Sequence, residues 1–391
     1  MANEAVAPGN LGNLAPDQER KLQQMWIQIL HICGVESLND AGTSNTAPEM
    51  SNGSLQRVDS APPGTFRRSL WSFILSEHPD ALVLRFLRAR KWDIEKAMTM
   101  LISAITWREE RAIGTAVIHT GENVALEEEQ SQDDKGFMSQ YRSGKSYVRG
   151  TDKEHRPIYI IKVRLHDPHL QSPAAMESYI LHNIESLRIL IKPPNDKCCL
   201  IFDMTGFGLK NMDFHVVKFL VSVFEARYPE TLGLVLIHNA PFVFWGIWNM
   251  IKGWLDPVIA SKINFTRKTA DLLQFIPEEN LQVDYGGNDS WEYQYADPEP
   301  GENVRLSEEE KRAKIQEERD ALIQEFERQT VEWASVEPES IDAKDREKDR
   351  SQLAELLSVN YWKLDPYIRA RTYHHRVGVV DETGHVDFKA A

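Results

Sequence analysis

The chain has 391 residues, of which 42% are hydrophobic, and it carries a formal net charge of -14 at pH 7. This length predicts about two or three structural units, and the acidic balance argues against general nucleic-acid binding or a polybasic membrane anchor. The three cysteines, Cys33, Cys198 and Cys199, offer neither the spacing of a zinc site nor a disulfide framework. No secretory leader opens the chain, so we expect a cytoplasmic protein in a reducing compartment.

The N-terminal residues predict helices separated by a linker. Apolar residues recur at helical spacing over 15–35, whereas 39–64 is rich in Ser, Asn, Gly, Pro and Thr and has no apolar period. Helical patterns return over 66–111, around a basic LRARKWD turn. We therefore predict an N-terminal helix and flexible linker over 1–68, followed by a helical lobe over 69–115.

The pattern changes to that of strands after residue 135. Two short apolar runs flank the polar turn TDKEHR and predict a hairpin. Continuous apolar runs farther along predict buried strands, and segments with helical spacing separate them. The predicted strands are 146–148, 157–163, 198–204, 232–238 and 263–266, and the predicted helices are 176–191, 214–228, 241–255 and 269–275. Strands that alternate with helices indicate an α/β layer over 136–288.

The composition changes again beyond Gly286 and Gly287. We predict a charged helical extension over 289–391, which contains a strongly acidic helix at 307–333 and then a polar linker. Residues 353–368 are too apolar for a disordered tail, so we expect them to fold back onto the main body. The acidic helix is a candidate docking segment for a protein partner.

The segment 242–255 carries apolar side chains on almost every face of its predicted helix. Such a helix must be buried or meet lipid, yet it is shorter than the roughly 20 residues that span a bilayer. Its tryptophans, Trp245, Trp248 and Trp254, suit an interface between protein and membrane. We therefore interpret the segment as a mobile cover over an apolar ligand site.

Familiar catalytic and cofactor motifs are missing from the sequence. Gly-x-Ser-x-Gly, His-Glu-x-x-His and Gly-x-Gly-x-x-Gly do not occur. The run GKS at 144–146 resembles the end of a phosphate-binding loop, but Ser139 stands where that loop needs its first glycine. Cys198 and Cys199 fall in an apolar strand, which is typical of inert buried thiols. We expect no enzyme, no cofactor and no metal site.

Three segments share the motifs of a known family. They are LRFLRARKWDIEKAM at 84–98, DKEHRPIYI at 152–160, and the run from IFDMTGFGLKNMD at 201–213 to VDYGG at 283–287. With these motifs the chain resembles the CRAL-TRIO lipid-binding family, in particular fungal phosphatidylinositol transfer proteins of the yeast phosphatidylinositol/phosphatidylcholine exchange type. The resemblance implies an α/β lipid pocket with a mixed β-sheet floor, flanking helices and a gate helix. An all-α N-terminal lobe and a helical C-terminal extension would complete this CRAL-TRIO fold.

The resemblance also implies which residues meet the lipid. In that family a Glu and a Lys spaced 32 residues apart contact the inositol phosphate, and Glu230 and Lys262 match them. Arg90 and Lys91 of the N-terminal lobe, and Asp152, are further headgroup candidates. The implied pocket and gate residues are Tyr159, Cys198, Leu200, Phe242, Phe244, Trp245, Trp248, Ile251, Trp254 and Ile259, and the implied hinges are Gly246, Gly253 and Gly287.

The chain departs from the family pattern where phosphatidylcholine would bind. Cys198 and Leu200 replace hydroxyl-bearing positions and Val148 replaces an aromatic one, whereas Tyr159 matches. Phosphatidylcholine exchange is therefore disfavoured. Another apolar lipid, such as a sterol precursor, becomes a candidate second ligand.

We expect a protein that binds phosphatidylinositol and transfers it between membranes through a gated hydrophobic pocket, with the phospholipid as ligand and no cofactor. Its expected partners are membrane surfaces, visited transiently from the cytoplasm, and not nucleic acid. An alternative is a lipid-sensing scaffold, or a carrier of another apolar lipid, that recruits a lipid kinase or a trafficking partner through the acidic helix. The sequence leaves the oligomeric state open.

Overall fold

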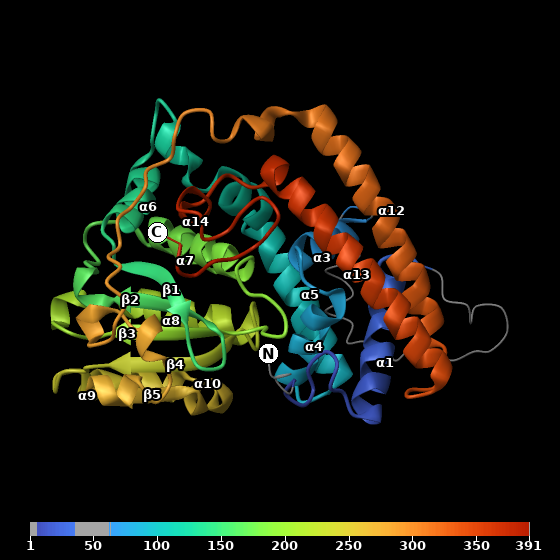
Figure 1. Cartoon of the computed structure of the whole chain (residues 1–391), viewed down its shortest axis with the longest axis horizontal. Helices are drawn as coiled ribbons and strands as arrows, with labels where there is room; N and C mark the ends of the chain where they lie inside the picture. The colour runs from blue at the N-terminus through green and yellow to red at the C-terminus, as the bar shows by residue number, and fades with distance from the viewer. Residues whose placement is uncertain (1–5, 36–61, 63, 391) are drawn as a thin grey trace. The chain divides into compact units, whose positions relative to one another are not determined.

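A computed structural model describes residues 6–35, 62 and 64–390 of the chain. These residues form two compact units, which we describe separately (Figure 1). The helical unit comprises the described part of residues 1–114 together with Glu308–Tyr367, and the sheet unit comprises the described part of Thr115–Ser307 and Ile368–Ala391. The predicted linker over 39–64 lies outside the described residues, except for Pro62 and Gly64.

The helical unit combines helices from both ends of the chain. They are α1 (Pro16–Ile32), α3 (Thr65–Ile74), α4 (Pro79–Ala89), α5 (Ile94–Glu110), α12 (Glu309–Ala334) and α13 (Ile341–Ile368). The apolar faces of α1, α3 and α12 meet around Phe326, whose ring lies 5.9 Å from that of Trp26 and 5.8 Å from that of Trp71. Figure 1 shows α12 and α13 running side by side. The C-terminal extension therefore completes the core of the predicted N-terminal lobe.

A buried ion pair joins the N-terminal and C-terminal helices of this unit. Arg350 on α13 donates to both carboxylate oxygens of Asp80 on α4, at 2.9 and 2.6 Å, and both side chains are almost fully buried. Burial by itself would raise the pKa of Asp80, but the charge and hydrogen bonds of Arg350 outweigh burial, so the pKa is lowered. Trp26 donates a further hydrogen bond of 2.7 Å to the same carboxylate.

The polar linker expected after the acidic helix is limited to residues 335–340, and the prediction is wrong from Ile341 onward, where the chain is helical. The helix α13 begins at Ile341 and continues through the charged stretch to Ile368. Its charged residues have partners inside the unit: Arg350 bonds Asp80, and Arg346 bonds Glu332 on α12 at 2.7 Å. Composition alone could not reveal these partners, because they come from other helices.

The sheet unit is built on a five-stranded mixed sheet, which confirms the predicted fold class. The strands lie in the order of the sequence; the first pair is antiparallel and the remaining pairs are parallel. They are β1 (Ser146–Thr151), β2 (Pro157–Lys162), β3 (Cys198–Asp203), β4 (Leu232–His238) and β5 (Ile263–Thr266). Because the four neighbouring strands β2 to β5 run parallel, all their amino ends meet at one edge of the sheet and their carboxyl ends at the other.

Both faces of this sheet are apolar, as expected for strands with continuous hydrophobic runs. On one face, Ile160, Ile201 and Leu236 pack against residues that follow β5. Residues that alternate with them along the strands, such as Tyr159 and Leu200, point to the opposite face. That opposite face forms the floor of the cavity described below.

The longer helices of the sheet unit begin at polar caps. Ser131, Ser172 and Asp213 accept hydrogen bonds from the backbone at the starts of α6, α7 and α8, respectively. The helices are α6 (Gln132–Arg142), α7 (Pro173–Arg188), α8 (Phe214–Ala226), α9 (Phe244–Ile251), α10 (Pro257–Ser261), α11 (Thr269–Leu272) and α14 (Tyr373–Arg376). The π-helix η2 (Ile113–Thr120) includes the boundary between the two units in the sequence. The short 3-10 helices of the sheet unit are η3 (Gly121–Leu126), η4 (Val163–Leu165), η5 (Leu209–Asn211), η6 (Lys252–Trp254), η7 (Glu278–Asn280), η8 (Val283–Tyr285) and η9 (Val304–Ser307). The predicted aromatic helix is thus α9 continued by η6.

The residues that follow α13 pack within the sheet unit. Glu122 is buried there and forms an ion pair with Arg376 of α14. Its carboxylate also accepts hydrogen bonds from the hydroxyl of Tyr295, at 2.5 Å, and from the backbone N–H of Tyr373, at 2.8 Å. The extension over 289–391, expected as a single segment, is therefore divided between the two units.

Candidate functional site

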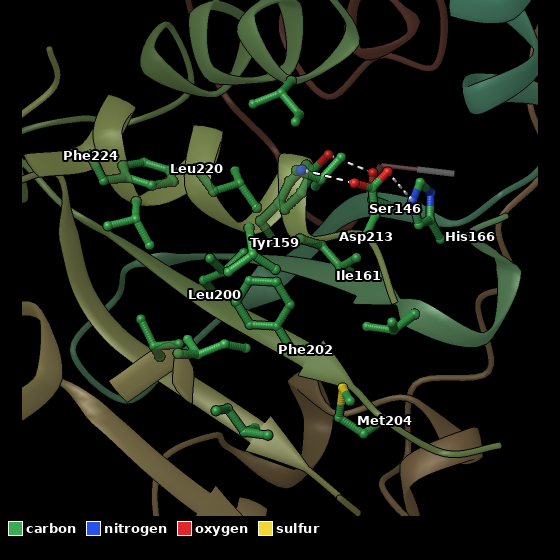
Figure 2. A pocket seen from close by; sticks show the side chains of 18 of the residues that line it. Ser146, Tyr159, Ile161, His166, Leu200, Phe202, Met204, Asp213, Leu220 and Phe224 are labelled. Carbon is green, nitrogen blue, oxygen red and sulfur yellow. Dashed lines mark hydrogen bonds and ion pairs between the residues drawn. The ribbon is translucent and has the colours of Figure 1, made fainter. Parts of the chain in front are cut away.

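A deep apolar cavity of about 240 Å³ lies between the sheet and the helices that cover it. Its floor is formed by alternate residues of β2, β3 and β4, and its walls by α7, α8 and α9. Figure 2 shows Tyr159, Leu200 and Phe202 of the floor, together with Leu220 and Phe224 of α8, around this space. Most of the lining is aliphatic or aromatic, so the cavity suits a hydrocarbon ligand.

The helix α9 closes one side of the cavity with a single face. Phe244, Trp248 and Ile251 line the cavity, and their spacing of four and three residues places them on the same side of the helix. Trp245 and Met250 lie on the other side and are 42% and 44% exposed. The helix is thus apolar on both sides, with one side against the cavity and the other toward solvent.

The structure places the implied pocket and gate residues in two groups. On the wall of the cavity are Tyr159, Cys198, Leu200, Phe244, Trp248, Ile251 and Ile259. Phe242, Trp245 and Trp254 do not line it: Phe242 is 93% exposed, the Trp245 ring packs 4.7 Å from Phe265, and the Trp254 ring lies 6.0 Å from Phe214. Trp245 directly follows Phe244 in α9, so its side chain leaves the helix in another direction, whereas Phe242 precedes α9 and Trp254 lies in η6.

Glu230 and Lys262 meet at the amino edge of the sheet, although 32 residues separate them. Glu230 precedes β4 and Lys262 precedes the neighbouring parallel strand β5, so both side chains leave the sheet at the same edge. Their charged atoms lie 3.4 Å apart, and the two side chains are 15% and 16% exposed. Lys262 also donates a backbone hydrogen bond to Ile259, a residue of the cavity wall. The pair therefore borders the cavity.

The other implied headgroup residues lie elsewhere. Asp152 is buried in the β1–β2 turn, where it accepts hydrogen bonds from the backbone of Glu154 and from the guanidinium of Arg156 at 2.6 Å. These bonds favour a structural role for Asp152 in holding the turn. Arg90 and Lys91 follow α4 in the helical unit, and their contact with a headgroup stays a prediction.

The implied hinge glycines have different surroundings. A side-chain carbon added to Gly246 or Gly253 would meet no atom within 4 Å, so neither glycine is required by packing. At Gly287 the same carbon would lie 2.1 Å from the carbonyl oxygen of Leu281, so this position tolerates only glycine. Close packing therefore accounts for Gly287, and a hinge role for all three stays a prediction.

Comparison with known proteins identifies the family. The CRAL/TRIO domain model matches residues 141–287, and the CRAL/TRIO N-terminal domain model matches 44–103. A protein named phosphatidylinositol transfer protein CSR1, from Eremothecium gossypii, is 34% identical over 95% of this chain and 98% of its own length. The chain belongs to the CRAL/TRIO family. The expected family membership is thereby confirmed.

Two further relatives of this CRAL/TRIO chain come from Schizosaccharomyces pombe. The CRAL-TRIO domain-containing protein C3H8.02 is 36% identical over 89% of the chain and 78% of its own length. The protein named Sec14 cytosolic factor is 27% identical over 63% of the chain and 88% of its own length. The likeness to C3H8.02 and CSR1 therefore includes much of the sequence beyond the CRAL/TRIO domain models.

In the part of the CRAL/TRIO chain that the structure describes, no helix is both long and apolar enough to cross a bilayer. The same residues contain no group of three or more His, Cys, Asp or Glu side chains arranged to hold a metal ion.

The adjacent cysteines of β3 are both buried. Burial raises the pKa of Cys198 to about 12, and it raises that of Cys199 well above the ordinary value. Thiols that stay protonated at neutral pH are poor nucleophiles. Cys198 therefore contributes a small apolar surface to the cavity wall.

Sequence reasoning missed a polar cluster at the carboxyl edge of the sheet. The cluster contains Lys145, His166 and Asp213, and Figure 2 shows His166 and Asp213 close together on one side of the cavity. Lys145 Nζ lies 3.1 Å from His166 Nδ1, and His166 Nε2 lies 3.2 Å from the carboxylate of Asp213. The three residues come from separate segments without a shared motif. The sequence signal at this place is the GKS run at 144–146, which lacks the first glycine of a phosphate-binding loop.

Proposed function

We propose that this CRAL/TRIO chain binds phosphatidylinositol and carries it between membranes. The observation that carries the proposal is the apolar cavity bordered at one edge by the Glu230–Lys262 pair. The relative CSR1, which the chain matches over nearly its whole length, is named a phosphatidylinositol transfer protein. Carriage of a lipid requires no bond to be broken, so the proposed role is that of a transfer protein and not of an enzyme.

The cavity can replace the apolar surroundings that the acyl chains of a lipid lose when the lipid leaves a bilayer. Each methylene exposed to water costs about 0.8 kcal/mol, so two chains of about sixteen carbons would cost roughly 25 kcal/mol. Contacts to the headgroup could not offset a cost of this size. The acyl chains must therefore enter an apolar space directly from the membrane, and the cavity lined by α7, α8, α9 and the sheet is such a space.

The Glu230–Lys262 pair has the chemistry of an inositol phosphate site. An ammonium group binds a phosphodiester through charge-assisted hydrogen bonds, and a carboxylate accepts hydrogen bonds from ring hydroxyls. In the structure the two groups pair with each other at 3.4 Å. We propose that the headgroup inserts between them, so that Lys262 bonds the phosphate and Glu230 bonds the ring.

The outer face of the gate region offers a surface for transient contact with a membrane. This region exposes four large apolar side chains between residues 242 and 258, namely Phe242 just before α9, Trp245 and Met250 on α9, and Val258 on α10. Aromatic side chains at such positions favour the interface between water and lipid. Because α9 also closes the cavity, insertion of its outer face into a bilayer would open the cavity toward the lipid.

A transfer assay with the full chain tests this proposal. Fluorescent phosphatidylinositol would be moved from donor to acceptor vesicles by the wild type, by Lys262→Ala, and by Lys210→Ala, which removes an exposed lysine of the same unit. We expect Lys262→Ala to lower the transfer rate at least about tenfold, because a charge-assisted hydrogen bond to the phosphate is lost. Lys210→Ala should transfer at the wild-type rate.

Mass spectrometry of lipids extracted from the purified full chain provides an independent readout. Phosphatidylinositol should be extracted from the wild type and from Lys210→Ala, and it should be depleted in Lys262→Ala. Equal phosphatidylinositol in all three proteins would contradict the assigned headgroup site. A different lipid in the wild type would contradict phosphatidylinositol as the cargo.

The acidic helix expected to recruit a protein partner is α12. Its Glu327 forms an ion pair of 2.8 Å with Arg67, and its Phe326 is fully buried in the core of the helical unit. These contacts give part of α12 a structural role. Recruitment of a lipid kinase or trafficking protein through its exposed acidic residues stays a prediction, which a lipid-dependent pull-down with the full chain would test.

A further inference from the structure

Lys145 is a buried amine at the polar end of the cavity, where burial lowers its pKa to about 7 and a bound anion would favour its charged form. Only 3% of the residue is exposed, and its Nζ contacts Gln140 Oε1, His166 Nδ1 at 3.1 Å and Met176 Sδ at 3.5 Å. The sulfur is a weak acceptor. Among the residues that the structure describes, no carboxylate lies within ion-pair distance of this ammonium. A buried charge without a counter-ion is costly, so the site favours an anionic oxygen.

The carboxylate of Asp213 is linked to Lys145 only through the imidazole of His166. In its charged form Lys145 can only donate, so His166 Nδ1 then accepts and its Nε2 carries the proton that points to Asp213, 3.2 Å away. Asp213 also caps α8 by accepting a hydrogen bond of 3.0 Å from the backbone N–H of Val216. The negative charge of Asp213 is thus shared between the imidazole and the start of a helix.

Hydroxyl groups stand next to this cation. Ser146 Oγ lies 2.5 Å from the hydroxyls of both Tyr159 and Tyr179, and all three residues line the cavity. Each hydroxyl can act as donor or acceptor, so the cluster can turn one O–H toward a ligand oxygen by exchanging a bond within the cluster. Lys145 offers in addition the N–H that it directs at the weak acceptor Met176.

The polar end of the cavity, which is formed by Lys145, Ser146, His166 and Asp213, is separate from the Glu230–Lys262 pair. Backbone pairing places Lys145 beside Lys162, which in turn pairs with Asp203 at the carboxyl end of β3. Glu230 and Lys262 stand at the amino end of the parallel strands. The six residues of β3 span about 16 Å at roughly 3.3 Å per residue, and the cavity floor between the two ends is apolar.

We propose that the cavity also binds a long-chain fatty acid, whose carboxylate meets Lys145 and the Ser146 hydroxyl cluster while its chain lies along Leu200 and Phe202. A carboxylate matches the site because it brings one negative charge and two acceptor oxygens, and Lys145 and the hydroxyl cluster supply one cation and one further donor. The monoacyl chain suits the apolar floor. This inference stands apart from phosphatidylinositol transfer, because it uses the opposite edge of the sheet.

Calorimetric titration of the delipidated full chain tests the proposal. The probes are laurate, lauryl alcohol and lauryl phosphate, which share a chain and differ in the polar end. We expect the wild type to bind laurate at least about tenfold more tightly than the alcohol, the effect of one charge-assisted hydrogen bond. Lys145→Met should abolish that preference, whereas Lys162→Met, on the opposite face of the same sheet edge, should keep it.

Three results would overturn the proposal: equal affinity of the wild type for acid and alcohol, an unchanged preference in Lys145→Met, or tighter binding of the phosphate than of the carboxylate. A measurement on the wild type alone avoids dependence on the folding of variants. With laurate labelled with carbon-13 at its carboxyl, the bound signal should keep its ionised position at a pH where the free acid is half protonated. A bound signal that titrates like the free acid would contradict contact with Lys145.

Discussion

Burial keeps His182 on α7 neutral in the folded sheet unit. It is 1% exposed, and its Nδ1 lies 2.5 Å from the hydroxyl of Tyr141. Burial lowers the pKa of His182 to about 3, and the positive charge of Arg369 adds to that effect. Burial likewise lowers the pKa of His374 to about 4, with help from Arg376. In the unfolded chain both would titrate near the ordinary value of 6.5.

From the buried His182 and His374 we predict that the folded chain loses stability in mild acid. Below pH 6.5 the two histidines become protonated in the unfolded chain but stay neutral in the folded chain. The free energy of unfolding therefore falls as the pH drops toward 4. Each histidine contributes a loss of up to about 1.4 kcal/mol per pH unit over that range. The stabilisation is fully present above pH 6.5.

Urea unfolding at pH 7 and pH 5 would measure this effect in the wild type and in His182→Gln. The glutamine can still meet the Tyr141 hydroxyl but cannot be protonated. We expect the variant to lose roughly 2 kcal/mol less than the wild type between the two pH values, because one titrating group is removed. Identical losses in the two proteins would show that His182 does not stay neutral in the folded state.

At the scale of elements, the eight residues of α9 close the cavity with one face and expose apolar side chains on the other. Phe244, Trp248 and Ile251 face the cavity, while Trp245 and Met250 face solvent. Removing side chains from the inner face would disturb the cavity and the fold together. Removing them from the outer face should leave the fold intact and change only what the exposed surface does.

This separation allows a sharp test of membrane contact. Phe242→Ser combined with Trp245→Ser should weaken binding to vesicles at least about tenfold, since a large apolar side chain gains about 1.5–3 kcal/mol when it leaves water. Co-sedimentation with vesicles would measure binding, and urea unfolding would show that stability is little changed. Ile341→Ser, which alters an 81% exposed residue of the helical unit, is the matched control. Equal vesicle binding by all three proteins would contradict the proposed contact surface.

At the scale of the whole molecule, the C-terminal extension is part of both units. In the helical unit, α12 and α13 complete the core and supply the partner of Asp80. In the sheet unit, Arg376 and its neighbours surround the buried Glu122. Removing the extension would leave buried carboxylates without their ion-pair partners in both units. The charge of this segment therefore serves the fold in addition to any binding role.

The Asp80–Arg350 pair predicts how strongly α13 is held. Asp80→Asn should lower the free energy of unfolding by about 3–5 kcal/mol, because it leaves the buried guanidinium without its counter-charge. Asp80→Asn combined with Arg350→Met removes both charges and should cost less than the single change. Urea unfolding of the three proteins at pH 7 would measure this. A double variant less stable than Asp80→Asn would contradict the assigned cause.

Several features of the fold could be predicted from short segments of the sequence. The strands at 232–238 and 263–266 match β4 and β5, because continuous apolar runs bounded by polar residues are a local property of buried strands. The apolar character of 242–255 indicated a cover in the same way. The family motifs placed Glu230 and Lys262 as a pair, and parallel neighbouring strands bring them within 3.4 Å.

Other features depended on residues that meet only in space. The composition of the charged stretch of α13 indicates a linker. Its helical structure depends on contacts such as that of Arg350 with Asp80, which lies 270 residues earlier in the sequence. Similarly, GKS at 144–146 is an incomplete motif by itself, and it becomes part of a site only where His166 and Asp213 join Lys145.

Sequence alone determined the fold class, the family and the presence of an apolar helix at 242–255, since periodicity and motifs reside in contiguous residues. Only the tertiary structure decided which face of that helix meets the cavity, which glycine is required by packing, and that a second polar end faces the first across the sheet. These properties arise from distances between segments far apart in the chain, and burial then sets the charge state of the groups that meet there.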